Sequence, residues 1–119
     1  MTFVKINDTR YPATVSGRIT DSSWDNRESK SITLEMDYKT AIDVFVDGLV
    51  WSIVGQHDVP VYDDKGIQIG TEVKDTEYDN SEFALAGDIT DHRDGTITVK
   101  MGKLTPLEEA YEMMFGGNE

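Results

Sequence analysis

Four side chains in the second half of the chain are of types that could bind a cation. Asp88, Asp91, His92 and Asp94 lie close together, and carboxylate oxygens and imidazole nitrogens are common metal ligands. Their spacing does not match the Asp-x-Asp-x-Asp-Gly pattern of a calcium loop. The other histidine, His57, is far away in the sequence. We therefore expect a solvated turn here and no bound metal.

The remaining sequence offers no recognisable catalytic set. It contains no cysteine, which excludes disulfides, thiolate metal sites and cysteine nucleophiles. It has neither a Gly-x-Ser-x-Gly motif nor a phosphate-binding glycine loop. A pair of carboxylates could act as in a glycosidase, but an acidic chain contains many such pairs by chance. We predict that the protein is not an enzyme and uses no cofactor.

Length and charge restrict the possible partners. The chain has 119 residues, which predicts a single domain over 1–119, and its net charge is −12. Such a charge disfavours direct binding to nucleic acid or an anionic membrane and is compatible with a basic protein partner. The N-terminus does not resemble a signal peptide, and no apolar run is long enough for a membrane helix. We expect a protein that is made in the cytoplasm and is not exported by a signal peptide.

One pattern occurs twice and dominates the predicted architecture. Residues 13–36 and 84–101 both contain Gly-x-Ile-Thr-Asp, then a turn, then Ile-Thr-x-x-Met. Apolar and polar residues alternate along both halves, which indicates half-buried strands. We predict two similar, superimposable hairpins. In each, the glycine should lie across from the methionine, where it makes room for the methionine or bends the strand.

The turn of the second hairpin allows a more detailed prediction. The sequence His92-Arg93-Asp94-Gly95 suits a type I turn followed by a glycine with positive φ. This turn would place Asp88 opposite Lys100. The same interpretation of the first copy places Arg18 near Glu35.

The loop of the first hairpin is longer than its counterpart. It has ten residues between Asp21 and Ile32, against five between Asp91 and Ile97, and Trp24 lies near its centre. An aromatic residue in a polar loop is a typical interface anchor. Alternatively, Trp24 folds back onto its own sheet.

Two short apolar runs predict strands, and the segment 37–48 fits either a helix or a strand. Residues 37–48 fit a helix with Asp37 as N-cap and Gly48 as C-terminal stop, and they fit less well as a strand. The short run 3–6 and the continuous apolar run 49–54 predict strands, the second of them buried, with Trp51 in the core.

Residues 58–82 concentrate negative charge. They include eight acids and two lysines, a net charge of −6. Two strand-like runs flank Asp63-Asp64-Lys65-Gly66, a sequence that suits a type I turn with a glycine bulge. Pro60 predicts an edge strand. We expect a projecting, acidic ribbon.

The C-terminal segment 105–115 carries the strongest local signal. Thr105-Pro106-Leu107-Glu108 is a capping box with proline at the first helical position. A helix of this length is not stable alone in water. Its apolar face must therefore dock, and we favour the protein's own sheet over a partner.

Together these elements predict an α+β, mainly β fold: an antiparallel sheet or partly open barrel built from two similar hairpins, one short internal helix and a C-terminal helix.

Three segments carry a resemblance to a known group of proteins. Residues 24–29, 47–54 and 86–96 resemble small uncharacterised proteins carried by prophages of Firmicutes, often encoded near tail and lysis genes. The likeness covers nearly the whole chain but carries no motif with chemistry. It implies a phage context, with a location in a bacterial host cytoplasm or a virion, and assigns no functional residue.

The function expected from these observations is contact with another protein. We expect a non-enzymatic phage protein, an accessory of the tail or baseplate, which could form a homo-oligomer. The alternative is an acidic inhibitor of a host defence protein, such as an anti-CRISPR, which mimics nucleic acid. In either case we expect the contact surface to join the loop of Trp24 to the acidic ribbon, with these residues in contact: Trp24, Arg27, Tyr62, Glu72, Asp75, Glu77 and Tyr78.

Overall fold

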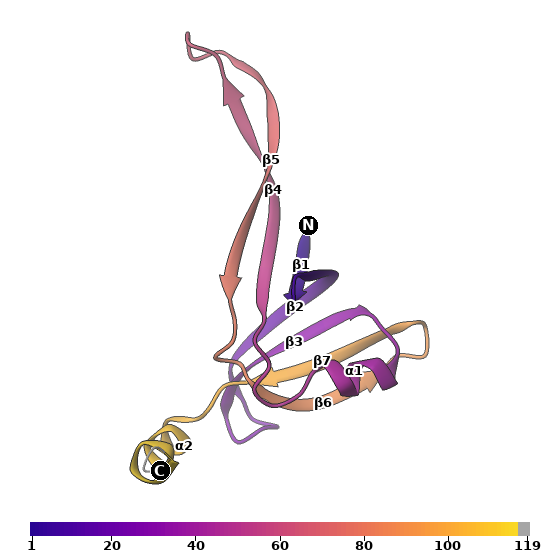
Figure 1. Ribbon diagram of the computed structural model, residues 1–119, viewed down its shortest axis with the longest axis vertical. Helices are drawn as coiled ribbons and strands as arrows, with labels where there is room; N and C mark the ends of the chain where they lie inside the picture. Colours follow the sequence, from indigo (N-terminus) through magenta and orange to yellow (C-terminus); the bar gives the residue numbers. More distant parts are fainter. Residues whose placement is uncertain (117–119) are drawn as a thin grey trace.

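Seven antiparallel strands form an open sheet in the computed structural model, which describes residues 1–116 (Figure 1). The strands are β1 (Thr2–Ile6), β2 (Thr9–Asp21), β3 (Arg27–Glu35), β4 (Ser52–Tyr62), β5 (Gln68–Asp79), β6 (Leu85–Asp91) and β7 (Thr96–Gly102). The helical segments are α1 (Tyr38–Val44), α2 (Pro106–Tyr111) and the π-helical η1 (Glu112–Gly116). The sheet order is β5-β4-β1-β2-β3-β7-β6. The expected α+β, mainly β class is confirmed in its open-sheet form. No helix within the described residues has the length and apolar character needed to cross a bilayer.

Strand β2 joins two parts of this sheet. Its residues 9–12 pair with β1, whereas residues 13–18 and Asp21 pair with β3. One part is therefore a group of strands around β1, β4 and β5, and the other, which we call the body, contains β3, β6 and β7. Figure 1 shows the β4–β5 hairpin extending well beyond the body. Beyond Gly55, β4 has no pairing with β1, and we call this outer part, residues 56–75, the ribbon.

The hydrophobic core lies on one face of the body, where α1 covers it. Ala41 and Phe45 from the α1 segment are buried with apolar side chains of β3 and β7. Trp51 is buried as expected, and its indole N–H donates to the carbonyl oxygen of Phe83 at 3.0 Å. The core also contains Val4, Ile6, Ile32, Leu34, Ile97, Val99 and Met101.

The opposite face of the body is polar. Directly paired residues project from the same face of a sheet, and the register places one threonine on each of four neighbouring strands in a single row. These are Thr14, Thr33, Thr98 and Thr90. In the second strand of each hairpin, the Ile-Thr pair therefore places isoleucine (Ile32, Ile97) in the core and threonine outside.

The local predictions hold best where caps and turns determine the backbone. Asp37 caps α1 by accepting the Thr40 N–H at 2.6 Å, so the helix interpretation of 37–48 is confirmed, although the helix ends at Val44. The expected strand over 49–54 is partly wrong. Strand β4 begins only at Ser52, where its pairing with β1 starts, and Val50 is exposed.

Both turn glycines have the expected positive φ, but the turn at 92–95 is not the expected type I turn, because its first central residue, Arg93, has a φ of 60°. Gly95 and Gly66 have φ of 90° and 78°, as the two glycine-bulge turns require. The expected pairing of Asp88 with Lys100 is not formed as such, because the register shifts between Ala86 and Ile89 and leaves Gly87 and Asp88 in a bulge across from Lys100. Lys100 nevertheless forms its ion pair with Asp21.

Two predictions about which residues lie opposite each other in the hairpins are wrong. Arg18 pairs with Ser29, not with a residue near Glu35. Neither repeat glycine faces a methionine, because Gly17 pairs with Lys30 and Ala86 occupies the position opposite Met101.

Candidate functional site

The most buried carboxylate of the body is Asp21, at the end of β2. It is fully buried and bonds to the Lys100 ammonium at 2.7 Å and to the hydroxyls of Ser23 and Ser29 at 2.6 and 3.0 Å. The Lys100 ammonium and these hydroxyls hold the pKa of Asp21 well below its ordinary value. A carboxylate that stays ionised and fully bonded is a poor general base. Asp21 instead ties the 21–27 loop to β7.

Trp24 lies on the polar face of the body, against glycines of the second hairpin. A Cβ built on Gly87 or Gly102 would lie 2.8 or 2.7 Å from the indole ring, so these positions must be glycine for the ring to pack there. The guanidinium of Arg27 lies over the same ring, 5.0 Å from its centroid. Trp24 is half-buried. Of the two interpretations of Trp24, the structure favours the one in which the ring folds back on its own sheet.

Arg27 holds the C-terminal segment and is not a surface residue. Its side chain is 4 % exposed, and it donates to both carboxylate oxygens of Glu108, at 2.6 and 3.0 Å, and to the carbonyl oxygen of Lys103. The Arg27 guanidinium and the capping N–H of Thr105 lower the pKa of Glu108 to about 2. The expectation that Arg27 contacts a partner is corrected, because its side chain is buried: both terminal nitrogens donate within the molecule, and the buried Nε has no hydrogen-bond partner among the described residues.

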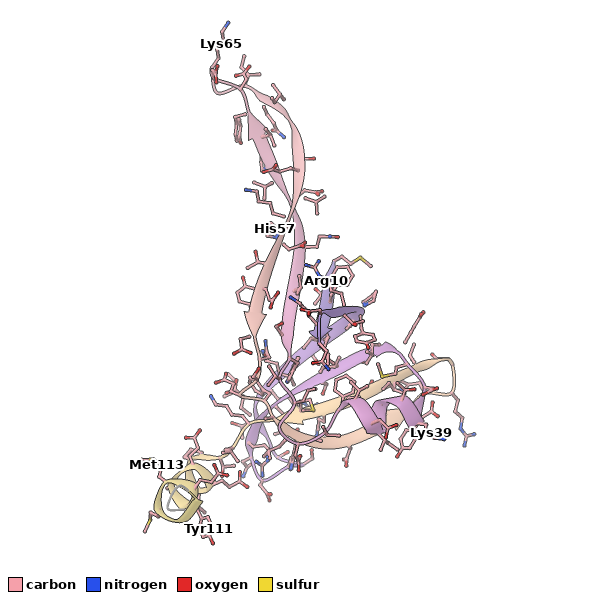
Figure 2. All side chains as sticks on the ribbon, viewed as in Figure 1. Arg10, Lys39, His57, Lys65, Tyr111 and Met113 are labelled. Atoms are coloured by element: carbon pink, nitrogen blue, oxygen red, sulfur yellow. The ribbon has the colours of Figure 1, made fainter. Side chains whose placement is uncertain are left out.

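This contact fixes the direction in which α2 and η1 face. The capping box is formed as expected, since Glu108 also accepts the Thr105 N–H at 2.9 Å. Glu108 therefore turns the polar side of α2 toward the body. Leu107 and Met113 are 81 % and 83 % exposed, and Figure 2 shows Tyr111 and Met113 on a segment that stands away from the sheet. The preferred prediction, docking of the apolar face on the protein's own sheet, is wrong.

Basic residues of the β1–β2 pair neutralise the carboxylates at the base of the β4–β5 hairpin. Asp75 accepts from Arg10 at 2.8 Å, and Glu77 accepts from Lys5 at 3.2 Å. These hydrogen bonds are the main reason that the pKa values of both carboxyls are lowered. Asp75 and Glu77 therefore help to fix the hairpin to β1 and β2 while remaining accessible to solvent.

The outer ribbon is exposed and partly apolar. Glu72 pairs with Lys74 on its surface at 3.3 Å. Tyr62 and Tyr78, which the sequence singled out, are both exposed, and so are several aliphatic side chains, namely Ile67, Ile69 and Val73. The ribbon thus projects as expected, but its surface combines apolar and acidic groups.

The single joint surface expected from the sequence does not form. The ribbon tip, marked by Lys65 in Figure 2, lies at the opposite end of the molecule from Met113. Trp24 lies near the Met113 end, because its neighbour Arg27 binds α2. The molecule therefore has two separate candidate contact surfaces: the outward side of α2 and η1, and the ribbon.

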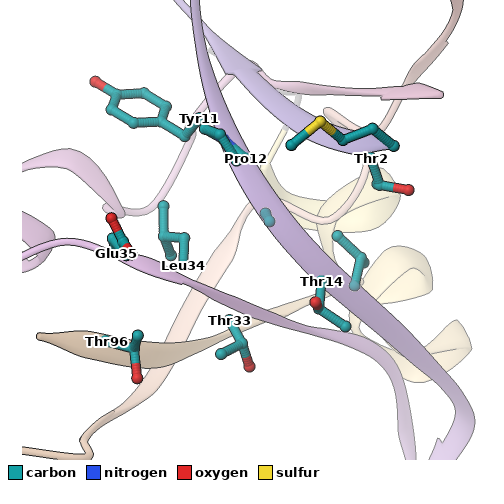
Figure 3. A pocket seen from close by; sticks show the side chains of 11 residues that line it. Thr2, Tyr11, Pro12, Thr14, Thr33, Leu34, Glu35 and Thr96 are labelled. Atoms are coloured by element: carbon teal, nitrogen blue, oxygen red, sulfur yellow. The ribbon is translucent and has the colours of Figure 1, made fainter. Parts of the chain in front are cut away.

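A third feature is an open hollow of about 800 Å³ where β2 leaves β3 (Figure 3). Threonine and apolar side chains line most of it, and Glu35 is the one carboxylate of the described lining. A lone carboxylate beside threonines does not form the base-and-nucleophile arrangement that hydrolysis requires. We assign no reaction to this hollow.

The carboxylates near the second turn stabilise that turn. Asp91 accepts the N–H of Arg93 at 2.9 Å, and Asp94 accepts the N–H and hydroxyl of Thr96 at 3.0 and 2.6 Å. Within residues 1–116 no group of three or more potential ligands is arranged to hold a metal ion. That the solution protein binds no metal remains a prediction.

Comparisons with protein-family models, curated proteins and solved structures found no match for this chain. The functional argument therefore rests on the surfaces described above.

Proposed function

We propose that this protein is a non-enzymatic phage or prophage protein that acts through protein–protein contacts as an accessory component of a tail or baseplate. One observation carries the proposal: α2 is fixed to the body through Glu108, so that the apolar side chains Leu107 and Met113 face away from it. Exposed apolar side chains on an amphipathic helix are what helix-in-groove recognition uses. The phage context comes from the sequence resemblance alone.

The shape of the molecule supports an assembly role. Its radius of gyration is 18.1 Å and its extents are 60 × 39 × 28 Å, whereas a compact domain of this length has a radius of gyration of about 13.5 Å. The difference comes from the ribbon and the C-terminal segment, which project in different directions (Figure 1). Projecting arms bury less surface within their own chain than a compact fold does, and they provide contact area for other chains.

The alternative, an acidic inhibitor that mimics nucleic acid, is supported less well. Asp75 and Glu77 are already neutralised by Arg10 and Lys5, which weakens the field that a basic groove would meet. Binding to a basic host protein with a steep salt dependence would favour this alternative.

Mass spectrometry of purified virions tests the proposal. We expect the protein in the particles, and its absence from them would refute the tail or baseplate role. The Leu107→Ser/Met113→Ser double variant should lower its incorporation at least about tenfold, since losing two apolar anchors costs more than about 1.4 kcal/mol. Val50→Ser, on an exposed apolar residue of the body, is the matched control and should be incorporated normally.

A further inference from the structure

The two edges of the sheet are protected very differently. At one edge, β6 has seven residues, contains the Gly87–Asp88 bulge and lies beside α1, and its Ala86 N–H donates to Asp47 at 2.8 Å. At the other edge, β5 has twelve residues and, among the strands of residues 1–116, pairs only with β4. Proteins normally protect long edge strands with bulges, prolines or covering segments, because an open edge is a template for further pairing. Strand β5 contains no proline, and its irregularity is confined to the tip, near Ile69.

The ribbon is also incomplete as a sheet. Beyond Gln56, whose backbone bonds to that of Met1, the described chain supplies two strands of the ribbon and no third one. A two-stranded hairpin is marginally stable in water, and a third strand or a packed face is needed for independent stability. The open edge of β5 faces away from β1, because β1 pairs with the other side of β4. An approaching strand would therefore meet no obstruction from β1.

We propose that β5 pairs antiparallel with β5 of a second copy of this chain, about a two-fold axis at Val73. A two-fold axis perpendicular to the sheet leaves each side chain on the same face of the sheet. Because directly paired residues share a face and neighbouring residues alternate between faces, such an axis must pass between a residue and its own copy in the other chain. An axis at Val73 places Glu72 opposite Lys74 of the other chain, twice by symmetry. It also places two exposed valines side by side.

Neighbouring registers are less favourable. An axis at Glu72, Lys74 or Asp75 would place a charged residue directly opposite its identical copy, which is destabilising. An axis at Thr71 opposes no like charges but creates no opposite-charge pair either. The sequence of β5 is therefore self-complementary about Val73. This inference is independent of the phage role, since it concerns only the chain and its copy.

Ionic strength should affect this dimer in a characteristic way. Each chain carries a net charge of −12, so the two copies repel each other at long range. Salt shortens the screening length from about 30 Å at 0.01 M to about 8 Å at 0.15 M. Self-association should therefore strengthen as salt is added, whereas binding to a basic partner should weaken.

The absence of cysteine from the sequence provides a direct test. In a Val73→Cys variant, every disulfide must join two chains, and directly opposed residues have a Cα separation of about 4.5–5.5 Å, within the disulfide range. Mild oxidation should cross-link this variant at least about tenfold faster than Ile67→Cys. The control residue is similarly exposed, 59 % against 61 %, but lies at the ribbon tip. Equal rates for the two variants would refute pairing at Val73.

Charge reversal tests the register by sedimentation equilibrium. Lys74→Glu should lower the association constant at least about tenfold, because it replaces two attractive pairs with two repulsive ones. The Glu72→Lys/Lys74→Glu double variant restores both pairs in swapped order and should recover wild-type association. A wild-type protein that stays monomeric at about 1 mM in 0.5 M salt would overturn the proposal. A dimer whose association constant is unchanged in Lys74→Glu would also overturn it, and so would a dimer that is lost in Leu107→Ser.

Discussion

The hairpins β2–β3 and β6–β7 share a sequence pattern but only half of a structure. Their second strands pair with each other, with Thr33 opposite Thr98 and each Ile-Thr-x-x-Met segment in the same position relative to that pair. A pseudo-two-fold axis therefore passes through this threonine pair. Their first strands do not obey it, because Thr14 pairs with Thr33 whereas Thr90 pairs with Thr98, and these two residues are not equivalent in the repeat.

The longer first loop explains the difference. The five additional residues move Gly-x-Ile-Thr-Asp toward the loop end of the first hairpin, where β3 begins at Arg27. The equivalent aspartates then have different surroundings: Asp21 is fully buried and paired with Lys100, whereas Asp91 is exposed at a turn. The Gly-x-Ile-Thr-Asp segment thus has a different role in each hairpin. These roles are determined by the register of the strands and not by the local sequence.

The largest expected effect tests which isoleucines of the pattern are core residues. Ile32 and Ile97 are equivalent and both are buried, so either change to alanine should cost about 2–5 kcal/mol. Ile19 belongs to the same pattern but is exposed, and Ile19→Ala should change the free energy of unfolding by less than about 0.5 kcal/mol. Urea denaturation of the three variants measures this. A large loss for Ile19→Ala would mean that the first strand is packed as the repeat alone implied.

Local sequence was sufficient to predict the caps and the turn glycines, but not the type of the turn at 92–95, where Arg93 has positive φ. Gly66, Gly95, Asp37 and the Thr105 capping box all follow from interactions within five residues, and all have the expected geometry. The register of β2 against β3 was not predictable in this way. It depends on a loop that is held by Asp21, Trp24 and Arg27 through partners in β7 and α2.

The second prediction compares the equivalent glycines of the two hairpins. A Cβ at Gly87 would lie 2.8 Å from the Trp24 ring, whereas at Gly17 the nearest atom would be 3.9 Å away. Gly87→Ala should therefore cost about 1–3 kcal/mol, and Gly17→Ala should be neutral or stabilising by up to about 1 kcal/mol. Thermal or urea unfolding provides the measurement.

Removal of the ring provides the control for this comparison. In a Trp24→Ala background, Gly87→Ala should lose most of its cost, because the clash is with the indole. Gly102→Ala should keep part of its cost, since its Cβ would also lie 2.8 Å from the Arg27 side chain. Equal costs with and without Trp24 would show that the ring does not rest on these glycines.

The third prediction concerns the equivalent aspartates and pH. The pKa of Asp21 is lowered in the folded protein, chiefly by Lys100, so its stabilising contribution is complete above the unfolded pKa of about 4. This contribution is lost as pH falls through the folded pKa. Asp21→Asn should therefore reduce stability at pH 7 and flatten the decline in unfolding free energy below about pH 4. Asp91→Asn is the matched substitution at the exposed turn and should have the smaller effect at pH 7. If the unfolding free energy of Asp21→Asn fell as steeply as that of the wild type below about pH 4, the buried ion pair would be contradicted.

The candidate contact surfaces were only partly predictable for a related reason. Arg27 and Glu108 are separated by 81 residues, and nothing in either local sequence indicates that they meet. Without that pair, an amphipathic C-terminal helix is expected to cover its own sheet. The pair instead turns the polar side of α2 toward the body, so that Leu107 faces solvent, while Trp24 lies half-buried on the polar face of the body. The ribbon, in contrast, was predictable, because it depends on one turn and two adjacent strands.

The smallest expected effect is at the pseudo-two-fold axis itself. The hydroxyls of Thr33 and Thr98 are 2.8 Å apart, and Thr98 also contacts the His92 ring nitrogen at 2.7 Å. Thr33→Val removes one partly buried hydrogen bond and should cost about 0.5–1.5 kcal/mol. Thr98→Val removes both contacts and should cost slightly more, although the exposed His92 can bond to water instead. In the Thr33→Val/Thr98→Val double variant neither hydroxyl is left unpaired, so the cost should be less than the sum of the single costs by about 0.5 kcal/mol or more. A double-mutant cycle measured by urea unfolding gives this coupling directly. Strictly additive costs would show that the two threonines, although equivalent in sequence and paired in register, do not interact across the axis.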